Sequence, residues 1–223
     1  MSTPEKELLV EIQDLTWGYP KSPSLIFDKF NFNLYKDDFC FVFGRSWVGK
    51  TTLIKFLIRS ITPPPKMIFY RKEDISRFTK KEVQKYRRRI WVVYQDFKLI
   101  DHKTVKENVE YPLEILWAKY DIIKKRVNDI LYRMNLMDKR NVYTPYLSWG
   151  EKQRVAIARA LVTNPEFIIA DEPTWNLDDQ TSKEILDYLI ELNKAWNTIL
   201  FITHDLTLKD YVREKHSVRV KNL

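Results

Sequence analysis

The stretch Gly44-Arg45-Ser46-Trp47-Val48-Gly49-Lys50-Thr51 matches the pattern GxxxxGK[ST], which is typical of loops that bind nucleotide phosphates. An apolar run at residues 39–43 precedes this loop and predicts a buried strand. Apolar residues then recur at helical spacing from about residue 50 to residue 61, where a run of prolines is expected to end the helix. The sequence therefore predicts a strand, a phosphate-binding loop and a helix in direct succession.

The residue types in this loop suit a phosphate group. Backbone N–H groups of the loop and the positive amino end of the following helix are expected to face the anion. Lys50 places a charge on the β- and γ-phosphates of a nucleotide, and Thr51 gives its hydroxyl group to Mg²⁺. The predicted phosphate-binding residues are Gly44, Arg45, Ser46, Trp47, Val48, Gly49, Lys50, Thr51 and Thr52.

Two acidic residues follow a second predicted strand. Residues 167–170 are apolar, and Asp171 and Glu172 come directly after them. Because parallel strands build their sites at their carboxyl ends, both side chains are expected near the phosphate-binding loop. Asp171 is predicted to hold the Mg²⁺ shell, and Glu172 to orient and deprotonate the attacking water. A strand that merely ends in polar residues is the alternative, and the neighbouring phosphate-binding loop disfavours it.

Ser148 and Glu151 have the spacing of a capping box at the start of a predicted helix, residues 151–161. One interpretation is a well-capped helix and nothing more. In the other, the free N–H groups at the amino end of the helix bind an anion. That anion would be the γ-phosphate of a nucleotide bound by a partner subunit. The spacing alone leaves both interpretations open.

Predicted strands alternate with predicted helices, which indicates one α/β domain over residues 1–223 with a mostly parallel sheet. The chain has 223 residues, of which 44% are apolar, enough for a sizeable core. Two of the predicted helices suggest a helical insertion at about residues 96–150. The predicted strands are 39–43, 91–94, 167–170 and 198–203, and the predicted helices are 50–61, 80–90, 104–117, 121–134, 151–161 and 180–195.

Charge and hydropathy indicate a cytoplasmic chain. The net charge is +8, which fits either solvated helix faces or attraction to the anionic inner face of a membrane. No nucleic-acid recognition motif accompanies this charge, so no nucleic-acid partner is expected. No apolar stretch approaches the roughly 20 residues that span a bilayer, and the polar start of the chain shows no signal peptide. The single cysteine, Cys40, lies in an apolar run, as expected of a buried thiol in a reducing compartment.

Several motifs in this order resemble the ABC ATPase family, and the resemblance covers nearly the whole chain. Beside the phosphate-binding loop stand LSWGEKQR at residues 147–154, ADEPT at 170–174, NLD at 176–178 and THD at 203–205. The resemblance implies a P-loop NTPase fold with a mostly parallel core sheet, an N-terminal antiparallel β part and a helical insertion. It also implies ATP hydrolysis by a homodimer that encloses two MgATP.

The family resemblance also implies roles for single residues. Lys50, Glu172 and His204 would be catalytic, and Thr51, Gln95 and Asp171 would bind Mg²⁺. The remaining implied contacts are Tyr19 with adenine, His204 with the γ-phosphate, Ser148 and Gly150 with the γ-phosphate on the opposing subunit, and Asp178 across the dimer interface.

Within this family, residues 86–89, 92–99 and 104–109 resemble the cell-division branch, FtsE. This resemblance implies an integral membrane partner like FtsX and a peripheral position on the inner face of the cell membrane. The ATPases of lipoprotein release and of macrolide export share much of the pattern and remain alternatives. A DNA-linked ABC ATPase is disfavoured, because the segment between the phosphate-binding loop and residue 147 has no cysteine pairs or sustained heptads.

Tryptophan occupies positions where glycine is expected. The resembling family has glycine at the positions of Trp47, Trp149 and Trp175. Trp117 stands at the join between two predicted helices and Trp196 follows a predicted helix, where glycine is common. FtsE-like sequences commonly have glycine at the position of Trp91, and Trp17 is the least clear case. The chain has 4 glycines and 7 tryptophans, whereas glycine usage of about 7% would give roughly 16 glycines. Because UGA codons are read as stop, tryptophan or glycine in different genetic codes, we hypothesise that the native protein has glycine at most of these positions. Genuine tryptophans would instead suggest a nucleotide-binding adaptor with little turnover.

Overall fold

The structure is a computed structural model that describes residues 6–20, 23–44, 49–195 and 197–223. Part of the predicted phosphate-binding loop, Arg45, Ser46, Trp47 and Val48, lies outside the described residues, as does Trp196. Every other predicted site residue lies within them.

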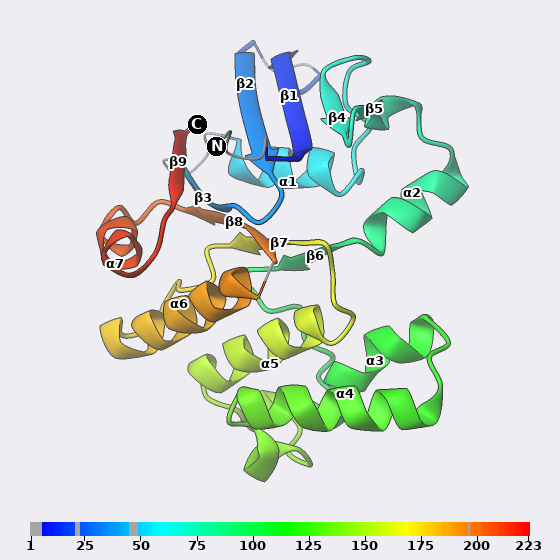
Figure 1. The fold of residues 1–223 in the computed structure, drawn as a ribbon, viewed down its shortest axis with the longest axis vertical. Coiled ribbons are helices and arrows are strands. Elements are labelled where there is room, and N and C mark those ends of the chain that lie inside the picture. The colour runs from blue at the N-terminus through cyan, green and yellow to red at the C-terminus, as the bar shows by residue number, and fades with distance from the viewer. Residues whose placement is uncertain (1–5, 21–22, 45–48, 196) are drawn as a thin grey trace, which may run out of the picture.

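Five parallel strands form the core sheet in the order β6-β7-β8-β3-β9 (Figure 1). Phe43 pairs with Thr203 and Asp171 pairs with Ile202, so β3, β7 and β8 end at the same edge of the sheet. This parallel sheet confirms the prediction from the alternating pattern. The strands are β3 (Phe39–Phe43), β6 (Ile90–Val93), β7 (Phe167–Asp171), β8 (Thr198–Thr203) and β9 (Arg219–Asn222).

The edge strand β9 was not predicted, because its residues are mostly exposed and polar and give no apolar run. Pairing with β3 holds it at the sheet edge. Arg219 of this strand donates a hydrogen bond of 2.7 Å to the buried carboxylate of Asp38, which lies just before β3. Leu223, the residue after β9, donates from its backbone N–H group to Phe43 O at 2.7 Å. Strand β9 therefore ends beside the start of the phosphate-binding loop.

A second sheet is antiparallel and has the order β2-β1-β4-β5. Its strands are β1 (Leu8–Trp17), β2 (Phe27–Tyr35), β4 (Ile68–Tyr70) and β5 (Glu73–Asp74). Helix α1 (Lys50–Leu57) packs between this sheet and the core sheet, since Leu53 and Phe56 share one buried cluster with residues of both sheets. The antiparallel β part that the family resemblance implied is therefore present.

The other helices are α2 (Lys80–Arg87), α3 (Val105–Ile115), α4 (Tyr120–Arg133), α5 (Trp149–Leu161), α6 (Asp179–Lys194) and α7 (Thr207–Lys215). Three short 3₁₀ helices span Ile75–Arg77, Met137–Lys139 and Thr144–Tyr146. Helix α7 was not predicted, whereas α2 to α6 lie within a few residues of the predicted ranges. Among the described residues, no helix is both long and apolar enough to cross a membrane.

The prediction that the first helix runs to residue 61 is wrong, because α1 ends at Leu57. The chain leaves the helix through Arg59, whose φ of 58° lies in the left-handed region. Arg59 N donates to Phe56 O at 2.9 Å, and Ser60 N donates to Lys55 O at 2.8 Å. These two bonds satisfy carbonyl groups at the helix end, so a C-terminal cap, and not the prolines, ends the helix.

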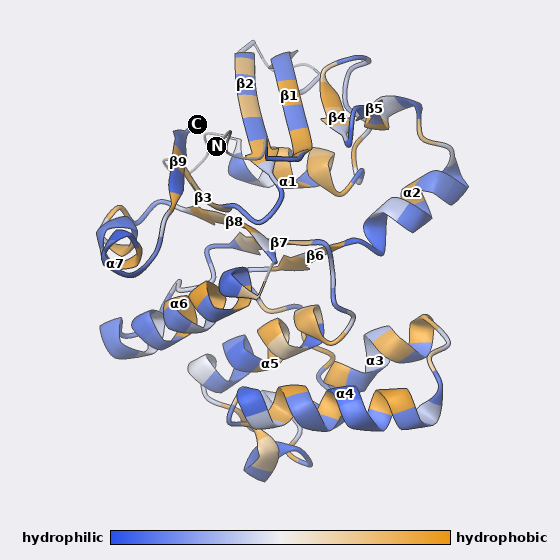
Figure 2. Cartoon of the chain, in the orientation of Figure 1, coloured by the Kyte–Doolittle hydropathy of each residue, from blue (hydrophilic) through white to orange (hydrophobic). Residues whose placement is uncertain are grey.

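The core sheet separates two buried clusters. One cluster joins the sheet to α3, α4, α5, α6 and α7, and the other joins it to α1 and the antiparallel sheet. Figure 2 shows β3, β6, β7 and β8 as hydrophobic over most of their length, as burial on both faces requires, whereas the edge strand β9 is mostly hydrophilic. Helices α3 and α4 fall within the predicted insertion at about residues 96–150. The assignment of a single domain to residues 1–223 stays a prediction.

Candidate functional site

The carboxyl edge of the core sheet brings together residues that lie far apart in sequence. Gly44 follows β3, Glu172 follows β7, and His204 follows β8. Gly44 N donates to Thr203 O at 3.3 Å, which joins the start of the phosphate-binding loop to the end of β8. The register of the strands therefore brings Gly44, the two acids and His204 to one edge of the sheet.

The backbone before α1 explains the second glycine of the loop. Gly49 is the residue that precedes the helix, and its φ of 100° is a conformation that other residues rarely adopt. A Cβ atom there would lie 2.6 Å from Ile26 Cγ2, so a side chain would also collide. The first turn of α1 carries no acidic residue, which leaves the positive amino end of the helix available to an anion.

Glu172 is the centre of a buried hydrogen-bond network. Its Oε1 atom accepts from the Lys50 ammonium group and lies 2.8 Å from His204 Nδ1. Its Oε2 atom accepts from Thr203 Oγ1 at 2.9 Å. Burial by itself would raise the pKa of Glu172, but the hydrogen bonds from Lys50 and His204 outweigh burial and lower it. Glu172 is therefore held as a carboxylate with its charge neutralised by Lys50.

Asp171 has the opposite electrostatic environment. Burial and the neighbouring charge of Glu172 raise the pKa of Asp171 to about 6, although Lys50 acts in the other direction. Burial and the neighbouring negative charge make the ionised form of Asp171 unfavourable, and a nearby cation would stabilise it. Thr51, at the start of α1, supplies an exposed hydroxyl group of the kind that Mg²⁺ accepts. The residues present therefore fit a Mg²⁺ site.

Tyr19 lies beside α1, as an aromatic contact for adenine requires. Its hydroxyl group is 3.1 Å from Thr52 Oγ1, and 40% of the residue is exposed. The ring packs edge-on against Trp17, with 4.6 Å between the ring centroids. Thr52 itself is buried, so its side chain supports Tyr19 instead of facing solvent. The nucleotide contacts of Tyr19 and Thr52 stay predictions.

Gln95 is exposed and comes two residues after β6 ends. Because β6 pairs with β7 up to Val93 and Ala170, Gln95 leaves the sheet beside the strand that carries Asp171. The intervening Tyr94 reports this proximity, since burial and then the charge of Asp171 raise its pKa. This position suits the predicted contact of Gln95 with Mg²⁺ and water.

A second group of predicted residues lies at the amino ends of α5 and α6. Ser148 caps α5, and Asp178 caps α6 by accepting from Thr181 N at 2.9 Å. A Cβ atom on Gly150 would lie 3.0 Å from Thr181 Cγ2, which shows how closely the two helix ends approach. The capping box of Ser148 and Glu151 is confirmed. Its additional role in binding a phosphate stays a prediction.

Sequence reasoning did not single out Thr203 as a separate site residue. Its side chain is buried, accepts from Asp205 N at 3.1 Å and donates to Glu172 Oε2. The available signal was its position as the last residue of a predicted strand, next to His204. Thr203 thus fixes the orientation of the carboxylate that Lys50 and His204 also contact.

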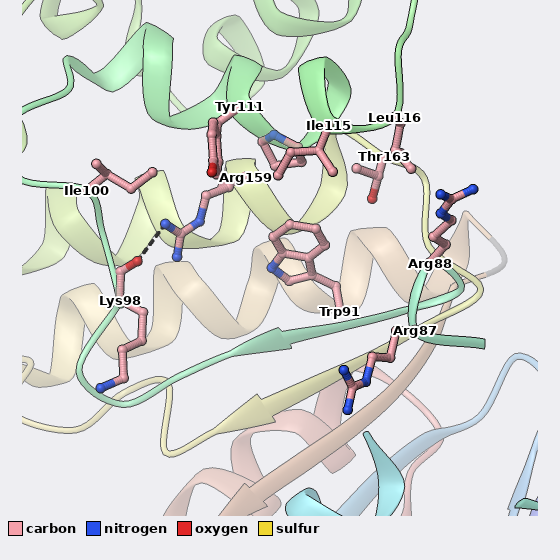
Figure 3. Close-up of a pocket in the computed structure, with 11 residues that line it drawn as sticks. Arg87, Arg88, Trp91, Lys98, Ile100, Tyr111, Ile115, Leu116, Arg159 and Thr163 are labelled. Atoms are coloured by element: carbon pink, nitrogen blue, oxygen red, sulfur yellow. Dashed lines mark hydrogen bonds between the residues drawn. The ribbon is translucent and has the colours of Figure 1, made fainter. Parts of the chain in front are cut away.

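A separate groove of about 370 Å³ lies between the core sheet and the helical part (Figure 3). Trp91 of β6 points into it, and Tyr111 and Ile115 of α3 face it from the other side. Arg159 of α5 lies between them and donates to Lys98 O at 2.6 Å. Most of the lining is apolar, and three exposed cations also line the groove: Arg87, Arg88 and Lys98.

Comparison with known proteins agrees with this geometry. The family model described as "ABC transporter" matches residues 27–175, which include the phosphate-binding loop, Ser148 and Asp171. The chain belongs to the ABC transporter family. As an ATP-binding chain of this family, it is an ABC-type ATPase with the P-loop NTPase fold. The family resemblance seen in the sequence is therefore confirmed.

Relatives of this ABC ATPase include cell-division proteins. It is 36% identical over 207 residues to the cell division ATP-binding protein FtsE of Bacillus subtilis (strain 168), covering 93% of this chain and 90% of that protein. It is 40% identical over 177 residues to FtsE of Escherichia coli (strain K12), covering 79% and 80%. A dimeric, post-hydrolysis structure of the ATP-binding cassette MJ0796 with ADP and Pi superposes with a TM-score of 0.84, at 30% identity and coverage of 96% and 94%.

Proposed function

We propose that this ABC ATPase is the FtsE-like subunit of a membrane complex in cell division and works as a homodimer that encloses two MgATP. The proposal of a dimer rests on one observation: the site residues form two separate groups. Lys50, Glu172 and His204 contact one another, whereas no hydrogen bond or ion pair among the described residues joins them to Ser148 or Gly150. The dimeric MJ0796 cassette, which covers nearly the whole chain, supports pairing of two copies.

Within one copy, the arrival of ATP redistributes the charges around Glu172. Lys50 is expected to leave Glu172 for the β- and γ-phosphates, because two phosphate groups carry more negative charge than one carboxylate. This exchange leaves Oε1 of Glu172 with His204 as its one remaining contact among the described side chains, so Oε1 can orient and deprotonate water. Thr203 keeps the other oxygen in place, and the partly exposed His204 can donate to the γ-phosphate.

Thr51, Gln95 and Asp171 are the residues that would hold Mg²⁺. Bound Mg²⁺ would neutralise charge on the phosphate oxygens. Asp171 supplies the buried carboxylate whose pKa is raised to about 6 by burial and by Glu172. Thr51 and Gln95 are both exposed. Thr51 lies in the first turn of α1, and Gln95 follows β6, the strand that pairs with β7. Tyr19 would stack on adenine beside α1.

The second copy would complete the pocket with the amino end of its α5. Ser148 and Gly150 present that helix end to solvent beside α6, where an approaching phosphate finds a positive dipole. Asp178, which caps α6, would lie at the interface between the copies. ATP thus bridges two copies, and hydrolysis removes the bridge and lets the dimer open.

The groove in Figure 3 is the proposed contact with an integral membrane subunit, like FtsX, at the inner face of the membrane. A cytoplasmic helix of that subunit fits an apolar groove with cations along its length, namely Arg87, Arg88 and Lys98. The groove borders the segment after β6, so a shift of Gln95 on ATP binding would reach the partner. The FtsE relatives favour this partner over those of lipoprotein release or macrolide export.

The variant Glu172→Gln tests the proposal. Glutamine keeps the hydrogen bonds from Thr203 and Lys50 but removes the base, so we expect ATP turnover to fall about 100-fold or more. ATP should then hold the variant as a dimer in light scattering. Glu184→Gln, on the exposed face of α6, is the control and should behave as the parent. Parental turnover by Glu172→Gln, or a monomer with ATP bound, would contradict the proposal.

A further inference from the structure

The described tryptophans avoid the buried core. Of the tryptophans at described positions, none is among the buried residues, and Trp117, Trp149 and Trp175 are 92%, 49% and 42% exposed. Tryptophan is normally one of the residues that is most buried on average, because its large apolar surface is costly in water. Trp17 and Trp91 are different, since both are partly buried against a hydrophobic cluster.

Trp117 also has a backbone that fits glycine. It follows the C-terminal cap of α3 with a φ of 55°. Trp117 N donates to Glu114 O at 2.9 Å, and Ala118 N donates to Leu113 O at 3.0 Å. These two bonds form the motif in which a left-handed residue, usually glycine, ends a helix. An L-residue with a Cβ atom strains the backbone in this conformation. The indole is 92% exposed, so it gains no packing energy that would offset this strain.

Other helices in this chain end with the same motif but with polar residues. Arg59 after α1 and Asn135 after α4 have φ values of 58° and 51°. The guanidinium group of Arg59 donates to Ile75 O at 2.6 Å and to Ser76 O at 2.9 Å, and asparagine tolerates the left-handed region well. Neither reason applies to an exposed indole at Trp117.

The tryptophans near the proposed nucleotide pocket are exposed as well. Trp149 is the first residue of α5, and its ring lies 5.1 Å from that of Phe97. Trp175 lies 5.2 Å from the ring of His204. Both indoles therefore stand at surfaces where the proposed dimer must bring a phosphate close to the backbone.

We propose that Trp117, Trp149 and Trp175 are encoded by UGA codons that the source organism reads as glycine, and that Trp47 and Trp196 share this codon. One decoding rule explains the exposed indoles, the left-handed backbone and a chain with 4 glycines where roughly 16 are typical. It also exposes the amino end of α5 and the surface around His204. That catalytic consequence rests on the proposed dimer, whereas the identity of the residues does not.

Peptide sequencing by mass spectrometry of the protein purified from its source organism tests the identity directly. We expect glycine in the peptides that cover positions 117, 149 and 175. Tryptophan at any of these three positions overturns the proposal. This readout does not depend on activity, so it separates the proposal from the proposed function. If these positions are glycine but Glu172→Gln keeps parental turnover, the proposed function is contradicted and the glycine reading of UGA is still supported.

A stability comparison tests the physical argument on recombinant chains. Trp117→Gly should raise the Tm by about 2–4 °C, because it removes backbone strain and an exposed indole. Trp17→Gly is the matched control and should lower the Tm, because Trp17 packs against Phe56 with 5.1 Å between the ring centroids. A fall in Tm with Trp117→Gly that matches the control would show that the indole stabilises the fold and would overturn the proposal.

Discussion

The two halves of the proposed nucleotide pocket differ in how their polar groups are satisfied. Glu172 is 7% exposed and receives hydrogen bonds from three residues distant in sequence. Ser148 is exposed, and its bonds are local: it accepts from Glu151 N at 3.3 Å, and the Glu151 carboxylate accepts from Ser148 N at 2.8 Å. The fold of one chain thus fixes the hydrolytic charges, whereas the end of α5 keeps a surface that another molecule can complete.

Removal of Lys50 should give the largest effect on the first half. Lys50→Ala takes away the charge for the phosphates, so we expect ATP turnover to fall about 100-fold or more. It also leaves Glu172 buried without its ammonium partner, which costs about 3–5 kcal/mol of unfolding free energy when no other group compensates. Steady-state ATPase and urea unfolding measure the two effects. Lys55→Ala, in the last turn of α1, is the control that should retain turnover.

A mixture of two inactive variants tests whether the halves come from different copies. Lys50→Ala impairs the loop half, and Ser148→Arg impairs the α5 half by filling its surface. Each variant alone should be inactive. In a mixed dimer, one pocket combines the intact Lys50 of one copy with the intact Ser148 of the other, so turnover should reappear on mixing. A mixture as inactive as its components would show that each chain uses its own α5 or that the copies do not pair.

Arg159 connects the two regions, and its loss should have an intermediate effect. Its guanidinium group is buried and donates to Phe97 O at 2.7 Å and to Lys98 O at 2.6 Å, which ties α5 to the segment after Gln95. Arg159→Gln should lower the unfolding free energy, because hydrogen bonds to a charged group are each worth about 1.5–3 kcal/mol, and the loosened segment after Gln95 should lower turnover about 10-fold. ATP affinity should change little, because the hydrogen bonds of Arg159 go to the backbone of Phe97 and Lys98 and not to a described residue that is predicted to bind phosphate. An unchanged turnover number would show that the two regions act independently.

The sequence predicted the location of the site better than its contacts. The pattern around Lys50 and the acids after residues 167–170 sufficed, because parallel strands must end at one edge. The ion pair between Lys50 and Glu172 was not predictable, since it joins residues 122 positions apart and depends on the strand register. The end of α1 was missed for a different reason: Arg59 adopts a left-handed backbone that residue type alone does not signal.

The smallest effect should decide between the two interpretations of Ser148. Ser148→Ala removes the capping hydroxyl group and should cost about 0.5–2 kcal/mol of unfolding free energy. Thr104→Ala is a matched control, because Thr104 and Glu107 form the same capping box at the start of α3, a helix that carries no predicted nucleotide contact. Urea unfolding should therefore show similar losses for both variants. Only Ser148→Ala should also lower ATP turnover. Equal turnover in both variants would mean that Ser148 caps the helix and does not contact the phosphate.

The pH dependence of this pair follows from the pKa of each glutamate. Backbone hydrogen bonds from Ser148 and Thr104 lower the pKa of Glu151 and Glu107, respectively. A carboxylate with a lowered pKa in the folded state stabilises the fold above its ordinary pKa, and this contribution is lost as the pH falls through the folded value. Both parental capping boxes should therefore weaken together in acid, visible as a falling Tm. A turnover defect at neutral pH, where both glutamates are ionised, that Ser148→Ala shows and Thr104→Ala does not then reports the phosphate contact alone.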